Sequence, residues 1–247
     1  MDKKIYHTIL EKKKKRKKQF AVLIDPDKFN PSSDLIEHCN AAKVDYLLLG
    51  GSILSTGNLE QCLEKIKKQT SIPVILFPGN TFQISSKADG IFLLSLISGR
   101  NPETLIGKHV IAAPMLRKSK LEIISTGYIL VESGKQTTVS YISNTQPIPA
   151  DKDDVAACTA MAGEMLGSKL IYLEAGSGAV NPVSSSMIKK VKENISVPLI
   201  VGGGIRTPEK AIQACKAGAD IIVVGNAIES NKLLVKKIAD SVHGFGF

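Results

Sequence analysis

The sequence has no tryptophan, few other aromatic residues and only four cysteines among its 247 residues. The cysteines are scattered, with no Cys-x-x-Cys pair and no histidine at metal-ligand spacing, so neither a zinc site nor a disulfide framework is indicated. No apolar run approaches the roughly 20 residues that a membrane-spanning helix needs. The apolar stretch after the basic N-terminus, Phe20–Ile24, is too short for a signal-peptide core. These absences predict a cytoplasmic protein with reduced thiols.

Positive charge is concentrated in one short segment. The net charge is +9, but seven positive residues form the run Lys12–Lys18, and +2 remains for the rest of the chain. The run is consistent with a solvated face of a first helix, and also with peripheral contact with an anionic membrane or an anionic substrate. Nucleic acid is not expected as a partner, because neither zinc-finger spacing nor an aromatic-rich basic stretch accompanies the run.

Short apolar runs alternate with longer amphipathic segments along the chain. The runs are continuously apolar, as expected for parallel strands that are buried on both faces. The eight predicted strands are Phe20–Ile24, Tyr46–Leu49, Val74–Phe77, Ile91–Leu94, Tyr128–Val131, Leu170–Leu173, Leu199–Val201 and Ile221–Val224. The predicted helices are Asp34–Ala42, Leu59–Gln69, Asp153–Leu166, Ser185–Glu193, Pro208–Ala217 and Asn231–Val242.

This alternation predicts an α/β fold, a (β/α)₈ TIM barrel that forms one domain over residues 1–247, with a basic N-terminal helix within residues 1–19. An open doubly wound sheet is the alternative, but its glycine-rich first turn is replaced here by Ile24–Lys28. Two intervals break the pattern. Asn80–Gly90 is too short for a helix with two loops, which predicts that the third helix is shortened or missing. Ser133–Lys152 is long and polar, as is typical of a lid.

Glycine-rich loops follow the last three predicted strands. They are Glu174–Gly178, Gly202–Arg206 and Gly225–Asn226. Consecutive glycines let backbone N–H groups point into one concavity, and a short helix beginning near Ala227 would direct its positive end to the same place. Barrels of this class often bind phosphate after strands seven and eight. The three loops together predict a phosphate-binding barrel, in which Arg206 either contacts the phosphate or pairs with a carboxylate outside the barrel.

Oxygen ligands lie at the ends of the first two strands. Asp25 ends the first strand and Ser52 follows the second, and a carboxylate with a hydroxyl suits Mg²⁺, which bridges substrate phosphates. Asp27 and Lys28 are expected to be turn and surface residues. Tyr172 and Glu174 share one side of strand six. If that side faces the lumen, Glu174 can accept a proton from a substrate hydroxyl.

Six stretches carry a resemblance to a known family. They are LIDPDK (Leu23–Lys28), LLLGGSILST (Leu47–Thr56), FPGN (Phe77–Asn80), YLEAGSGA (Tyr172–Ala179), VGGGIRTPEKA (Val201–Ala211) and VVGNAIE (Val223–Glu229). In this order they resemble the geranylgeranylglyceryl phosphate synthases and their heptaprenylglyceryl phosphate relatives. The glycine elements alone occur in many phosphate-binding barrels, whereas the combination with IDPDK, GGS and YLEAGSGA is much more specific.

The resemblance implies a transferase that joins the sn-3 hydroxyl of sn-glycerol 1-phosphate to a long prenyl diphosphate, most simply geranylgeranyl diphosphate, in ether lipid synthesis. It implies that Asp25 and Ser52 hold Mg²⁺, that Tyr172 and Glu174 are catalytic, and that the enzyme is a homo-oligomer. It also implies a substrate site formed by Tyr172, Leu173, Glu174, Ala175, Gly176, Ser177, Gly178, Gly203, Gly204, Gly225 and Asn226. The family's barrel lacks its third helix, in agreement with the short interval described above.

Two other functions are consistent with parts of the sequence. A phosphosugar isomerase or cyclase would use the same glycine loops but would need neither an apolar tail site nor a metal at Asp25. A non-catalytic barrel that binds anionic lipid through its basic run would tolerate replacement of Asp25 and Glu174. The histidines are assigned no catalytic role, because they fall in predicted helices, in the tail and, for His109, in a turn before a strand.

Overall fold

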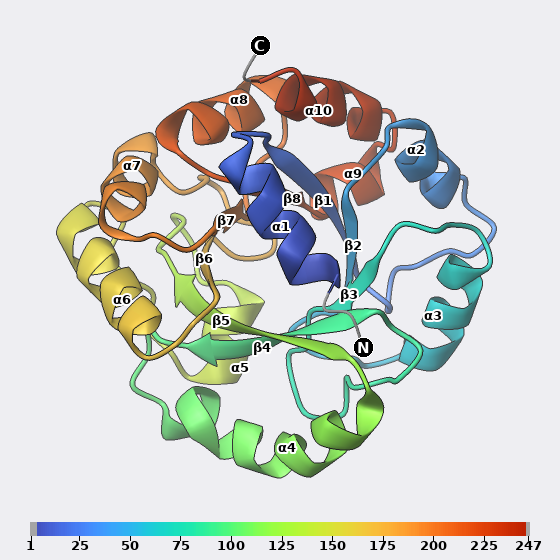
Figure 1. Ribbon diagram of the computed structural model, residues 1–247, viewed down its shortest axis with the longest axis horizontal. Helices are drawn as coiled ribbons and strands as arrows, with labels where there is room; N and C mark the ends of the chain where they lie inside the picture. Colours follow the sequence, from blue (N-terminus) through green and yellow to red (C-terminus); the bar gives the residue numbers. More distant parts are fainter. Residues whose placement is uncertain (1–3, 246–247) are drawn as a thin grey trace.

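The computed structural model describes residues 4–245 and contains a closed barrel of eight parallel strands in sequence order (Figure 1). The strands are β1 (Gln19–Ile24), β2 (Tyr46–Leu49), β3 (Val74–Leu76), β4 (Gly90–Leu96), β5 (Glu122–Leu130), β6 (Leu170–Glu174), β7 (Leu199–Gly202) and β8 (Ile221–Val224). The barrel closes where Gln19–Val22 of β1 pair with Ile221–Val224 of β8. The predicted TIM barrel is confirmed, and two of the eight strands have the predicted bounds.

Helices surround the barrel and follow most of the strands. They are α1 (Lys4–Lys14), α2 (Leu35–Ala41), α3 (Leu59–Lys67), α4 (Lys108–Ser119), α5 (Thr138–Ser143), α6 (Asp153–Met165), α7 (Ser185–Asn194), α8 (Pro208–Ala217), α9 (Asn226–Ser230) and α10 (Leu234–His243). A π-helical turn, η1 (Glu103–Gly107), leads into α4. No helix lies between β3 and β4, as the short interval predicted. Within residues 4–245 no helix is long and apolar enough to cross a membrane.

Helix α4 and strand β5 are two of the elements that differ from the prediction. Helix α4 was not predicted, and β5 begins at Glu122, six residues before the predicted start. Consequently His109 lies in α4 and not in a turn. The amphipathic pattern of α4 is obscured because Val110, Ile111 and Met115 lie on its exposed face. Its interior Pro114 is a second reason, since proline normally ends a helix.

Two apolar layers hold the barrel together. Side chains from alternate strand positions fill the lumen, where Phe77, Phe92, Tyr128 and Tyr172 form an aromatic cluster. The remaining strand positions pack against the helices and form the larger outer core. The aromatic cluster fills the middle of the barrel, so open space remains only toward its ends.

Helix α1 covers the end of the barrel at which the strands begin (Figure 1). Ile5 and Ile9 are buried in the luminal layer, and the Glu122 carboxylate accepts hydrogen bonds of 2.8 Å from the backbone N–H groups of Ile5 and Tyr6. Part of the basic run fastens this helix to the barrel, since Lys12 pairs with Asp45. Lys18 donates a 2.7 Å hydrogen bond to the Ala219 carbonyl. The run therefore lies at the end of the barrel opposite the carboxyl ends of the strands.

Candidate active site

A cavity of about 320 Å³ lies at the carboxyl ends of the strands. It brings together residues from loops that are far apart in the sequence, because parallel strands end at the same rim of a barrel. The lining includes eleven of the residues predicted for the site, namely Asp25, Ser52, Tyr172, Glu174, Gly176, Ser177, Gly178, Gly203, Gly204, Gly225 and Asn226.

Two predicted substrate-binding residues do not line the cavity. The side chains of Leu173 and Ala175 belong to the outer core, packed between the strands and the helices. The reason is strand alternation, which directs Tyr172 and Glu174 into the lumen and their neighbours outward. The backbone N–H of Ala175 donates a 3.1 Å hydrogen bond to the Gly202 carbonyl. The side chains of these two residues therefore point away from the cavity, and their contact with substrate stays a prediction.

Glu174 is the buried carboxylate of the cavity. Burial raises its pKa to about 6, although a 2.6 Å hydrogen bond from the Gly176 backbone N–H favours the charged form. Beside it, the Tyr172 hydroxyl is buried and close enough to the Glu174 carboxylate to lower its pKa, but no hydrogen bond of regular geometry satisfies it among the described residues. A buried hydroxyl without a partner is costly, so an oxygen atom of a ligand in the cavity would stabilise it. The pair can thus orient a substrate hydroxyl and accept its proton near neutral pH.

Glycines form an anion-binding surface next to this carboxylate. Gly176, Gly178, Gly203 and Gly204 all have positive φ, between +70° and +96°. At Gly203 the absence of a side chain is essential, because a Cβ would overlap the Glu174 carboxylate and lie 2.7 Å from the Gly176 nitrogen. Successive backbone N–H groups in such conformations create a concavity with positive potential, which suits a phosphate.

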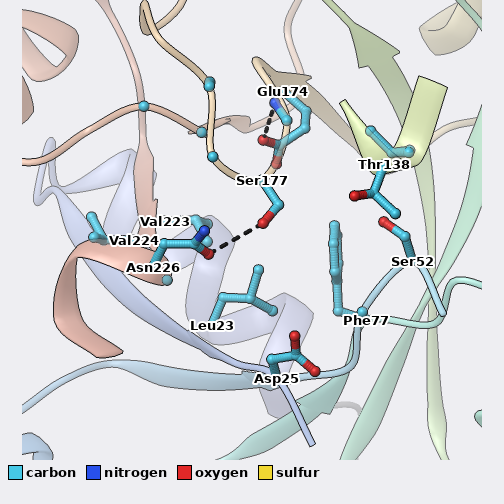
Figure 2. Close-up of a pocket in the computed structure, with 18 of the residues that line it drawn as sticks. Leu23, Asp25, Ser52, Phe77, Thr138, Glu174, Ser177, Val223, Val224 and Asn226 are labelled. Carbon is cyan, nitrogen blue, oxygen red and sulfur yellow. Dashed lines mark hydrogen bonds between the residues drawn. The ribbon is translucent and has the colours of Figure 1, made fainter. Parts of the chain in front are cut away.

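The loop after β8 completes this surface from the other side. The Ser177 hydroxyl donates a 3.2 Å hydrogen bond to the side-chain oxygen of Asn226, which joins the β6 and β8 loops (Figure 2). The short helix predicted near Ala227 is present as α9. Arg206 lines the cavity and pairs with no carboxylate among residues 4–245; its guanidinium donates to the carbonyls of Ala179 and Val180, and its contact with a phosphate stays a prediction. Arg206 thereby holds the β6 loop closed, and backbone groups are left to face the anion.

Asp25 and Ser52 provide the oxygen atoms that a magnesium ion would need. The Asp25 carboxylate lies against Gly51, where a Cβ would be 3.5 Å from its Oδ1 atom, and Ser52 is the next residue of the chain. In Figure 2 the Ser52 hydroxyl points toward Thr138 and not toward the Asp25 carboxylate. The described residues contain no group of three or more His, Cys, Asp or Glu side chains that could hold a metal. Two hard oxygen donors fit Mg²⁺ that takes its remaining ligands from water and a substrate diphosphate. The donor set is consistent with the predicted site.

Asp27 and Lys28 stabilise the surrounding loops. The Asp27 carboxylate accepts hydrogen bonds from the backbone of Ser55, Thr56 and Gly57 and from the Ser55 hydroxyl, which lowers its pKa to about 2. Lys28 reaches both Asp25, at 3.4 Å, and Glu229, at 3.2 Å. Asp27 is indeed a turn residue, but its charge fixes the β2 loop that carries Ser52.

A second, apolar groove of about 130 Å³ opens from the cavity. The two spaces share Gly51, Ser52, Phe77, Tyr128 and Val139. From there the groove passes along the loop after β3 to α4, where Ile84, Ile91, Leu93, Ala112 and Leu116 line it. It occupies the side of the barrel where no helix lies between β3 and β4. The groove provides an apolar path that begins beside Ser52.

This arrangement matches a known family over most of the chain: residues 11–243 match the PcrB family. The chain belongs to the PcrB family. PcrB relatives include the geranylgeranylglyceryl phosphate synthase of Chitinophaga pinensis, which is 59% identical over 98% of this chain and 97% of its own. The corresponding protein of Pyrococcus furiosus is 45% identical over 92% of this chain and 90% of its own. The family predicted from the six sequence stretches is confirmed.

Solved structures agree with the family assignment. The (S)-3-O-geranylgeranylglyceryl phosphate synthase of Thermoplasma acidophilum, crystallised with sn-glycerol-1-phosphate, has a TM-score of 0.91 and 34% identity. That match covers 97% of this PcrB chain and 98% of the other. The tryptophan synthase α subunit of Legionella pneumophila has a TM-score of 0.62 at 18% identity, a similarity of fold alone.

The PcrB sequence did not reveal every residue of the cavity. Thr138 and Val139 begin α5, within the segment predicted to be an unstructured loop, and both line the cavity. In Figure 2 the Thr138 hydroxyl faces that of Ser52. The one feature of the sequence that could have indicated the start of α5 is the capping box, in which the Thr137 and Ser140 side chains each bond to the other residue's backbone. A six-residue helix with little periodicity is difficult to recognise from sequence.

Proposed function

We propose that this chain is a prenyltransferase that joins the sn-3 hydroxyl of sn-glycerol 1-phosphate to geranylgeranyl diphosphate, releasing diphosphate, in ether lipid synthesis. The observation that supports this most strongly is the connection between two different spaces. A polar cavity with a buried carboxylate and a glycine-lined anion site opens at Ser52 and Phe77 into an apolar groove. A phosphosugar isomerase would need the cavity but not the groove.

Each part of the site has a distinct role in this reaction. The loops of Gly176–Gly178 and Gly203–Gly204 bind the phosphate of sn-glycerol 1-phosphate. This position directs the sn-3 hydroxyl toward Glu174, which accepts its proton as the oxygen attacks the allylic carbon. A pKa of about 6 leaves Glu174 mostly ionised at neutral pH and still basic enough to take the proton. The Tyr172 hydroxyl orients the same substrate.

Asp25 and Ser52 would hold Mg²⁺, which neutralises the charge of the departing diphosphate. Ser52 lines both the cavity and the groove, a position that keeps the diphosphate next to the acceptor while the prenyl chain lies in the groove. Burying this chain contributes roughly 0.8 kcal/mol per methylene. The segment Ser133–Lys152 acts as a lid, with α5 covering the cavity and excluding water from the reacting carbon.

The protein is further proposed to act in the cytoplasm as a homo-oligomer. Exposed apolar side chains on η1, α4 and α5 support oligomer formation, because a patch of this kind often marks an interface. They are Ile106, Val110, Ile111, Met115, Tyr141 and Ile142. Peripheral contact with an anionic membrane would involve the exposed Lys14, Arg16 and Lys17. Because these residues lie at the opposite end from the cavity, such contact would attach the enzyme without covering its active site.

The proposal is tested by incubating the protein with radiolabelled sn-glycerol 1-phosphate, Mg²⁺ and a series of prenyl diphosphates, followed by extraction into organic solvent. We expect extractable label that disappears with EDTA and in Asp25→Asn. The donor series identifies the preferred chain length in the same experiment. Binding of sn-glycerol 1-phosphate without extractable product from any donor would refute the transferase and favour a phosphosugar enzyme.

A further inference from the structure

The phosphate end of the cavity contains backbone N–H groups but few available cations. Two basic side chains, Lys28 and Arg206, line the cavity. Lys28 is paired with Asp25 and Glu229, on the side of the proposed metal site. The Arg206 guanidinium donates hydrogen bonds to the carbonyls of Ala179 and Val180. Both cations are thus engaged by oxygen atoms of the protein, so a dianionic phosphate at the glycine loops would meet mainly the partial charges of backbone N–H groups.

One lysine outside the recognised motifs lies over this surface. The Nζ atom of Lys135 is 3.5 Å from the position that a Cβ on Gly178 would occupy. The side-chain nitrogen of Asn226 lies 4.0 Å from the same point. Gly178 therefore leaves space in which the ammonium group of Lys135 approaches the loops after β6 and β8. The other lysine of the segment, Lys152, pairs with Asp151, whereas no carboxylate among residues 4–245 pairs with Lys135.

The backbone around Lys135 is anchored on both sides. Before it, the Ser133 carbonyl accepts a 3.1 Å hydrogen bond from the Asn181 backbone N–H. After it, the buried Thr137 packs on Gly176, where a Cβ would lie 2.8 Å from the Thr137 Cβ. Both anchors join the segment to the loop that follows β6. Lys135 is thus carried by a short connection fixed at each end, and its position over Gly178 is set by the fold as well as by its own flexible side chain.

We propose that Lys135 is a substrate-binding residue that supplies the positive charge for the phosphate of sn-glycerol 1-phosphate. This inference rests on the proposed function, because it takes that phosphate as the ligand. A lysine ammonium group binds phosphate as a mobile point charge and tolerates a range of geometries. Its place on the proposed lid gives the lid a direct interaction with bound substrate, so the phosphate itself favours the closed arrangement of Ser133–Lys152.

Binding measurements on three variants test the proposal. Lys135→Gln removes the charge at nearly constant length, Lys135→Arg keeps the charge, and Lys152→Gln removes an exposed lysine elsewhere in the same segment. Titration calorimetry with inorganic phosphate and with sn-glycerol 1-phosphate gives Kd for each. We expect Kd to rise about five- to tenfold in Lys135→Gln and less than about twofold in the other two variants. The salt dependence of binding should also weaken in Lys135→Gln.

Kinetics separate this role from other effects of the substitution. We expect a higher KM for sn-glycerol 1-phosphate in Lys135→Gln, with kcat and the KM for prenyl diphosphate unchanged. An unchanged Kd for both anions would overturn the proposal, as would an equal loss in Lys152→Gln. A parallel rise in the KM for prenyl diphosphate would overturn it too, since the charge would then serve the diphosphate. If the wild-type protein binds both anions but transfers no prenyl group, the proposed function fails, and the binding comparison still decides the role of Lys135.

Discussion

Replacing Glu174 by glutamine should stabilise the protein while inactivating it. The carboxylate is buried in the barrel, and burial raises its pKa from an ordinary value near 4.5 to about 6. Each pKa unit corresponds to 1.36 kcal/mol, so the charged form costs the folded state about 2 kcal/mol. Glutamine has the same shape without the charge, and its carbonyl can still accept the hydrogen bond from Gly176. The buried charge is therefore maintained for function at the expense of stability.

The sign of this effect depends on pH. Below about pH 4.5 the carboxyl group is protonated in both the folded and the unfolded chain, so the stability cost is absent. Because the folded pKa is the higher one, the cost develops as pH rises and is complete above about pH 6. The difference in unfolding free energy between Glu174→Gln and wild type should thus grow from near zero at pH 4 to about 2 kcal/mol at pH 8.

Urea unfolding at several pH values between 4 and 8 measures this difference, and the organic-phase assay measures activity. Glu132→Gln, which alters an exposed side chain after β5, is the control and should unfold like the wild type. We expect Glu174→Gln to lower kcat by a factor of roughly 10² to 10⁴, as for loss of a general base. A variant that is less stable than the wild type at pH 8, or a difference independent of pH, would refute the reasoning.

Three further substitutions test separate parts of the site. Gly203→Ala should abolish binding of sn-glycerol 1-phosphate in calorimetry, because the added Cβ would overlap the Glu174 carboxylate. Gly167→Ala is the control: Gly167 also has a positive φ (+94°), but no atom lies within 4 Å of the added Cβ, so this variant should lower Tm without changing binding. Asp27→Asn should reduce kcat/KM several-fold at neutral pH by loosening the loop that carries Ser52, and unchanged kinetics would contradict this role. Ala112→Phe should shift the preferred donor to a shorter prenyl chain, and an unchanged donor profile would exclude the groove as the tail site.

Much of the barrel and of its polar site could be predicted because both depend on local signals. Parallel strands are apolar on both faces, so runs such as Tyr46–Leu49 and Ile221–Val224 stand out, and their bounds are those of the structure. The site follows from the strands, since residues directly after them gather at one rim. Asp25, Ser52 and the glycine loops after β6, β7 and β8 were therefore located without knowledge of any contact.

Other features depend on contacts between distant segments. Helix α4 carries apolar residues on its exposed side, so its sequence does not show which face is buried, and the helix was missed. Arg206 could have pointed to a phosphate or to a carboxylate, and only the packing of the β6 loop directs it to Ala179. The places of Thr138 and Lys135 in or beside the cavity likewise depend on how the segment after β5 folds back over β6.

By itself, then, the sequence determined the strand order, the family and the residues at the rim, because each depends on neighbours along the chain. Only the tertiary structure decided that the cavity and the apolar groove adjoin at Ser52 and Phe77, which line both. This arrangement requires β2, β3, β4 and β5 to follow one another around the barrel and no helix to cover the gap between β3 and β4. The tertiary structure also raises the pKa of Glu174, because the side chains packed around its carboxyl group exclude water.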